Sequence, residues 1–110
     1  MAHIPVLLNE ILQYLDPKPG DNFIDCTVGE GGHALAILKM VVPTGKVLGI
    51  DRDADTVDVL RNSVSESRLI IEHGNFADVE EIARKHNFSK INGVLFDFGM
   101  SSWQLEESGA

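Results

Sequence analysis

The sequence has 110 residues, of which 44% are hydrophobic and 24% charged, and its formal net charge is −8. This length and composition predict one globular domain over residues 1–110. The acidic balance disfavours non-specific binding of nucleic acid, because Lys and Arg make the phosphate contacts. Cys26 is the single cysteine, which excludes an internal disulfide or cysteine-based zinc site and favours a reducing, cytoplasmic compartment.

Helical and strand-like patterns alternate along the chain. A helix is expected over 6–15, ended by the two prolines of the Asp16–Gly20 segment, which lack amide protons. Apolar runs then predict strands over 22–26, 46–50, 69–72 and 93–98, with helices over 33–40, 54–64 and 79–86. This alternation predicts an α/β, Rossmann-like fold with a partial parallel sheet of about four strands. A complete doubly wound sheet has more strands, so two or more strands are expected to be missing here, either because the sequence is part of a longer chain or because the protein is a reduced one.

A glycine-rich loop follows the first predicted strand, with glycines at 29, 31 and 32. Glycines between a strand and a helix let the backbone approach a ligand closely. The spacing also fits the loose dinucleotide pattern G-x-G-x-x-G/A, and a tight turn without a ligand is the alternative. His33 follows the glycines and is expected to orient the loop, with a role as a ligand or an acid/base group as the alternative.

Acidic residues distinguish between the nucleotide ligands that such a loop can hold. Asp25 and Glu30 flank the glycines without any Lys or Arg, and two like charges about 4 Å apart cost on the order of 4 kcal/mol at a dielectric of 20. The loop therefore repels the pyrophosphate of NAD and attracts a cation, which favours S-adenosyl-L-methionine. The sequence Gly-Lys-Ser/Thr of a P-loop is absent.

Further candidate residues follow the later strands. Asp51 ends the second strand roughly 20 residues beyond the glycines, where a carboxylate meets ribose hydroxyls, and Asp53 or Asp55 is expected to cap the next helix. Phe76, after the third strand, either packs on adenine or belongs to the core, with Asn75 or Asp78 as a helix cap. Asp97 interrupts the last apolar run, where a buried carboxylate is costly without partners.

Five motifs in this order resemble the bacterial 16S ribosomal RNA cytosine-N4-methyltransferases, over nearly the whole chain. They lie at 3–10, 24–33, 49–53, 73–76 and 93–105.

The resemblance implies a Rossmann-like methyltransferase that binds S-adenosyl-L-methionine and acts on the N4 amine of a cytidine. It implies 16S ribosomal RNA or the small ribosomal subunit as partner, and it assigns no general base. The implied cofactor contacts are Gly31, Gly32 and His33 at the methionine end, Asp51 at the ribose, Phe76 near the adenine, and also Asp97 and Gln104.

The chain departs from the family pattern at Phe98, where Leu is usual, and at Trp103, where Pro or Met is frequent. Trp103 is expected either to stack on an extruded base or to be an ordinary aromatic. The family continues beyond the point matching Ala110, and that region is expected to carry most RNA contacts. Three alternatives follow: a cofactor-binding module without activity, a methyltransferase of another substrate class, and, more distantly, a dehydrogenase.

Overall fold

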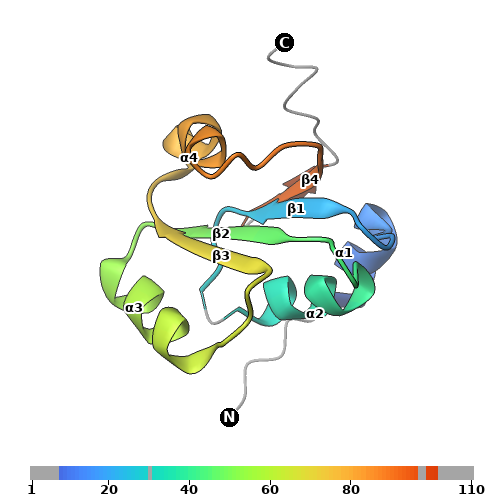
Figure 1. Ribbon diagram of the computed structural model, residues 1–110, viewed down its shortest axis with the longest axis horizontal. Helices are drawn as coiled ribbons and strands as arrows, with labels where there is room; N and C mark the ends of the chain where they lie inside the picture. The colour runs from blue at the N-terminus through green and yellow to red at the C-terminus, as the bar shows by residue number, and fades with distance from the viewer. Residues whose placement is uncertain (1–7, 30, 97–98, 102–110) are drawn as a thin grey trace.

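The computed structural model describes residues 8–29, 31–96 and 99–101. In these ranges one sheet carries helices on both faces (Figure 1). The strands are β1 (Asn22–Asp25), β2 (Val47–Asp51), β3 (Leu69–His73), β4 (Ile91–Phe96) and β5 (Gly99–Ser101). The helices are α1 (Leu8–Leu15), α2 (Gly32–Met40), α3 (Ala54–Ser63) and α4 (Val79–Lys85), with the 3-10 helix η1 (Phe76–Asp78) before α4.

The sheet has the order β3-β2-β1-β4-β5, with β1 to β4 parallel. The predicted parallel sheet and α/β class are therefore confirmed. The expectation of about four strands misses β5, which pairs antiparallel to β4 from Phe96↔Gly99 to Val94↔Ser101. A strand of three residues is too short to show a period in the sequence. The predicted strand over 93–98 begins earlier, at Ile91, and residues 97–98 lie outside the described ranges.

Two apolar layers bury the sheet, one on each face. Phe23 and Val47 point to the face covered by α1, α2 and α3, and Ile24 and Leu48 point to the face covered by α4. All four side chains are fully buried. Consecutive buried residues in one strand are expected where helices cover both faces of a parallel sheet. Among the described residues, no helix is long and apolar enough to cross a membrane.

The strand order places a switch point beside β1. The chain runs from β1 outward to β2 and β3, and then returns across the sheet to β4 on the other side of β1. In open α/β sheets, ligands bind outside the carboxyl ends of the strands at such a reversal. The loop after β1 and the ends of β2 and β3 are therefore the first place to look for a site.

Candidate functional site

Backbone hydrogen bonds attach the loop after β1 to its two neighbouring strands. The amide of Cys26 donates to the carbonyl of Leu95 in β4 at 2.7 Å, and the amide of Val28 donates to Ile50 in β2 at 2.9 Å. The loop thereby continues the carboxyl edge of the sheet on both sides of the switch point.

Glycine is required at the end of this loop. Gly31 precedes α2 with a φ of 88°, in the left-handed region that a side chain disfavours. A Cβ at this position would lie 3.0 Å from Cδ1 of Leu60 in α3. The missing side chain therefore permits both the turn into α2 and the close approach of α3.

Asp51, at the carboxyl end of β2, holds the loop through its side chain. One carboxylate oxygen accepts the amide of Gly29 at 3.1 Å, and the other accepts the amide of Asp53 at 3.0 Å. The side chain is partly exposed, and each oxygen has a second acceptor position that a ribose hydroxyl can use. Asp53 in turn caps α3 by accepting the amide of Asp55 at 3.0 Å, as predicted.

The start of α2 offers donors and one unpartnered imidazole nitrogen. Gly31 has no side chain that could cap the helix, so the amides of the first turn depend on other acceptors. His33 is partly buried, and its Nε2 is buried with no hydrogen-bond partner among the described residues. Burial lowers the pKa of His33 below its ordinary value of 6.5, so the imidazole is neutral at pH 7. A buried polar atom of this kind is costly unless a ligand or neighbour bonds it.

Negative charge lies directly beneath the loop. Asp25, at the end of β1, is 2% exposed, and one of its carboxylate oxygens accepts the amide of Thr27 at 3.1 Å. Burial, followed by the negative charge of Asp25, raises the pKa of the adjacent Cys26 thiol to about 12. Asp25 thus places a buried carboxylate at the base of the loop, whereas Glu30 lies outside the described residues.

The segment after β3 reaches the same edge of the sheet. The amide of Gly74 donates to the backbone carbonyl of Asp51 at 2.9 Å, and Asn75 caps η1 by accepting the amide of Ala77 at 3.2 Å. Phe76 follows with 48% of its surface exposed, so the alternative that it is a core residue does not hold. Asp78 makes no side-chain cap to α4.

The fold thus brings five of the predicted contacts to one edge, after three neighbouring strands. These residues are Gly31, Gly32, His33, Asp51 and Phe76. The remaining two, Asp97 and Gln104, lie outside the described residues.

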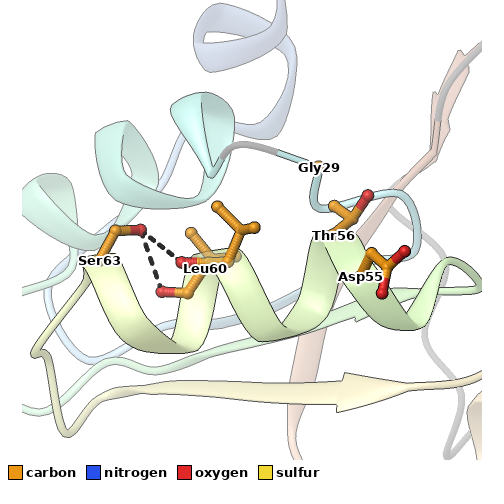
Figure 2. Close-up of a pocket in the computed structure, with 6 residues that line it drawn as sticks. Gly29, Asp55, Thr56, Leu60 and Ser63 are labelled. Carbon is orange, nitrogen blue, oxygen red and sulfur yellow. Dashed lines mark hydrogen bonds between the residues drawn. The ribbon is translucent and has the colours of Figure 1, made fainter.

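The sequence analysis missed a hollow of about 510 Å³ beside the glycine loop. Figure 2 shows Asp55 and Thr56 of α3 next to Gly29, with Leu60 and Ser63 further along the same helix. The Ser63 hydroxyl donates back to the carbonyl of Val59 at 2.8 Å, so it is already partnered within α3. The sequence could have indicated this hollow, because Asp55 and Thr56 follow the predicted site residue Asp51 by only four and five positions. The hollow borders the loop from the α3 side, and none of the five predicted contacts that the structure describes lines it.

Comparison with solved structures identifies the fold. Protein-L-isoaspartate O-methyltransferase superposes with a TM-score of 0.71 at 14% identity, and the match covers 89% of this chain and 30% of that one. The fold is that of the Rossmann-like methyltransferases. A sequence profile of the MraW methylase family matches residues 1–109, so the chain belongs to this family.

Curated relatives agree with this family. The ribosomal RNA small subunit methyltransferase H of Syntrophotalea carbinolica is 39% identical over 106 residues, which are 94% of this chain and 34% of that protein. The protein of the same name from Thermomicrobium roseum is 43% identical over 108 residues, or 96% of this chain and 33% of the relative. The chain thus spans about one third of the length of these relatives.

Proposed function

We propose that residues 1–110 form the S-adenosyl-L-methionine-binding part of a methyltransferase that acts in the cytoplasm on the N4 amine of a cytidine in 16S ribosomal RNA. The observation that carries this proposal is the match of nearly the whole chain to relatives named ribosomal RNA small subunit methyltransferase H. The partner is the ribosomal RNA, alone or within the small ribosomal subunit.

The residues at the carboxyl edge fit the cofactor's chemistry. S-adenosylmethionine carries a sulfonium and an ammonium but no phosphate, and this edge has Asp25 and Asp51 with no Lys or Arg in the described part of the loop. The first-turn amides of α2 suit the cofactor's carboxylate, because helix N-termini favour anions. The unpartnered Nε2 of His33 lies in the same turn.

Each end of the cofactor has a proposed contact. Gly31, Gly32 and His33 hold the methionine end, and the remaining acceptor positions of Asp51 bind the ribose hydroxyls. Phe76 offers an exposed ring to the adenine. Asp97 and Gln104 are proposed to complete the site.

The chemistry depends on positioning. The bound cofactor supplies an electrophilic methyl group on its sulfonium, and the cytidine N4 is a weak nucleophile because its lone pair is delocalised into the ring. Residues that align the N4 atom with the methyl group lower the activation barrier by several kcal/mol, as in other reactions between well-oriented groups. We assign no general base. The segment 97–103 follows β4 and is the proposed place for acceptors around the amine.

Calorimetry with S-adenosylmethionine and S-adenosylhomocysteine tests the cofactor. Asp51→Asn leaves an amide nitrogen where one carboxylate oxygen accepted a backbone N–H, and it removes the charge. We expect a loss of affinity of roughly 10- to 100-fold, since hydrogen bonds to charged groups contribute about 1.5–3 kcal/mol. Asp58→Asn makes the same charge change on an exposed position of α3 and should bind as the wild type. Absence of binding by the wild type at high micromolar cofactor overturns the proposal.

Methylation of ribosomal RNA from cells that lack the enzyme tests the substrate. Labelled methyl groups should appear on a cytidine N4 of 16S ribosomal RNA, identified by nucleoside mass spectrometry. Cofactor binding without transfer would favour the catalytically inactive module, and transfer to a protein or small molecule would favour another methyltransferase class.

A further inference from the structure

The amino edge of the sheet, opposite the proposed cofactor site, carries a second hollow of about 540 Å³. Lys46, Arg68 and Lys90 line it, and each directly precedes a strand: β2, β3 and β4 respectively. The chain has only nine Lys and Arg in total, so one third of them lie along this edge. Because parallel strands begin at the same edge, the three cations form a row across it.

The polar framework of this edge is fixed by Asn22, the first residue of β1. Its side-chain oxygen accepts the amide of Lys46 at 3.0 Å, and its side-chain nitrogen donates to the carbonyl of Ser89 at 3.1 Å. The backbone on both sides of β1 is therefore held in register. Lys46 and Lys90 begin strands that flank β1, so their backbones lie about 10 Å apart, two strand spacings.

The three cationic side chains differ in their hydrogen-bond and ion-pair partners. Arg68 donates from Nη1 to the carbonyls of Leu38 and Gly45 at 3.2 and 2.9 Å, and its Nε lies 3.3 Å from Glu66. Arg68 is thus a structural clamp. Lys46 and Lys90 are exposed, and within the described residues no ion pair or hydrogen bond involves either side-chain amine.

The carboxylates near this hollow are already engaged. Asp21 accepts the amide of Lys18 at 3.0 Å, Glu66 pairs with Arg68, and Glu72 lies 2.9 Å from His86 and 3.3 Å from Lys85. No carboxylate lines the hollow itself among the described residues. The two lysines do not serve to stabilise helix C-termini either. Both directly precede strands and lie outside the last turns of α2 and α4.

We propose that this hollow, defined by Lys46 and Lys90 with Asn22 and Ser89 between them, binds backbone phosphates of the RNA substrate. The inference rests on the proposed function for the nature of the ligand, whereas the site itself is separate from the cofactor edge. A row of cations without sequence-reading groups contacts phosphate and positions a strand without selecting its bases. In a chain of net charge −8, this edge provides the positive surface that RNA binding needs.

The test measures binding of the cofactor-loaded protein to a single-stranded oligonucleotide of small-subunit ribosomal RNA across a salt series. The double variant Lys46→Gln with Lys90→Gln should reduce the slope of log affinity against log salt by about 1.4, if each lysine neutralises one phosphate. At 0.1 M salt this slope corresponds to a loss of about 25-fold in affinity. S-adenosylmethionine affinity and the melting temperature should stay unchanged, because both side chains are exposed.

The matched control is Lys39→Gln with Arg84→Gln, which removes the same charge from exposed helix positions outside the hollow. Equal losses in both double variants, or no loss in either, would overturn the inference. So would a wild type that binds no RNA, whatever its cofactor affinity. Pyrophosphate binding that requires the two lysines, with RNA binding independent of them, would assign the hollow to a free anion instead. Failure of cofactor binding alone would overturn the proposed function and leave this site standing.

Discussion

The two edges of the sheet are each fastened by one charged side chain, and the two charges are opposite. At the carboxyl edge, the Asp51 carboxylate accepts the backbone amides of Gly29 and Asp53. At the amino edge, the Arg68 guanidinium donates to the backbone carbonyls of Leu38 and Gly45. Helices begin at the first edge, where amides lack acceptors, and end at the second, where carbonyls lack donors.

The comparison distinguishes charged side chains that stabilise the fold from charged side chains that remain available to bind ligands. Asp51 and Arg68 satisfy backbone groups that the fold itself exposes at each edge. Within the part of the chain that the structure describes, what remains is an acidic carboxyl edge with an unpartnered nitrogen on His33, and an amino edge with unpaired amines on Lys46 and Lys90. One edge suits a cation and the other an anion, so a cofactor and an RNA backbone need not compete for the same surface.

Removing the clamp at the amino edge should have the largest effect on stability. Arg68→Ala removes the guanidinium donor from the carbonyls of Leu38 and Gly45, of which, among the described residues, Leu38 keeps only a 3.4 Å bond from the amide of Val41, and we expect the free energy of unfolding to fall by about 2–3 kcal/mol. Arg84→Ala, which removes an exposed arginine from α4, should cost less than about 0.5 kcal/mol. Urea unfolding followed by circular dichroism measures both. Similar values for the two variants would show that Arg68 is not a clamp.

A methyl group at Gly31 should disturb the carboxyl edge specifically. Gly31→Ala forces a side chain into the left-handed region at about 1–2 kcal/mol and brings its Cβ to 3.0 Å from Leu60. We expect lower stability together with a loss of S-adenosylmethionine affinity of about tenfold, which corresponds to 1.4 kcal/mol.

The matched variant is Gly93→Ala, whose Cβ would lie 2.9 Å from Leu15, away from the loop. It should destabilise the fold and leave cofactor affinity unchanged, as thermal melting and calorimetry would show. Equal losses of affinity in both variants would mean that the weaker binding reflects lower stability of the whole fold and not a change in the loop itself.

The pH dependence of stability tests the buried nitrogen of His33. Burial lowers the pKa of this imidazole, so the unfolded chain takes up a proton near pH 6.5 while the folded chain does not. The free energy of unfolding should therefore decrease as the pH falls below 6.5. In His33→Gln this component is absent, and the profile between pH 7.5 and 5.5 should be flatter than in the wild type. Parallel profiles would contradict the assignment.

The smallest effect is expected at Glu72 in β3, whose carboxylate lies 2.9 Å from His86. Burial alone would raise the pKa of this carboxyl, but hydrogen bonds from His86 and Lys85 outweigh it and lower the pKa. The stabilisation is therefore complete above the ordinary pKa of 4.5 and is lost as the pH falls through the lower folded value.

Glu72→Gln should accordingly lose about 0.5 kcal/mol at pH 7 and converge with the wild type at pH 3. Asp58→Asn, on an exposed face of α3, is the control in the same unfolding measurements. A difference that persists unchanged at pH 3 would indicate a packing effect instead of an ionic one.

The sequence predicted the carboxyl edge well, because the features there are local. Buried apolar runs marked four strands, and the acidic or glycine residues that follow them had to lie at one edge once the strands were parallel. Asp51 and Phe76 were found in this way. The hydrogen bond from Gly29 to Asp51 was not predictable, because it joins residues 22 positions apart through a loop geometry that no pattern encodes.

The amino edge was not predicted, because the rule for ligand sites in open α/β sheets concerns only the residues that follow strands. A cation before each of β2, β3 and β4 was visible in the sequence at Lys46, Arg68 and Lys90. The sequence could not show that Arg68 bonds the backbone while Lys46 and Lys90 make no described ion pair, because this distinction depends on side-chain contacts. The strand β5 and the strand order also depend on long-range pairing, which periodicity does not contain.

Cys26 follows β1 directly, at the start of the glycine loop, and its side chain is buried among the apolar residues that α4 covers. A thiolate at this edge of the sheet would be open to alkylation by an electrophilic cofactor, because thiolates are strong nucleophiles. With a pKa of about 12, the thiol is ionised in roughly one molecule in 10⁵ at pH 7. The buried position of Cys26 and the charge of Asp25 therefore keep this thiol protonated and unreactive at the proposed cofactor edge.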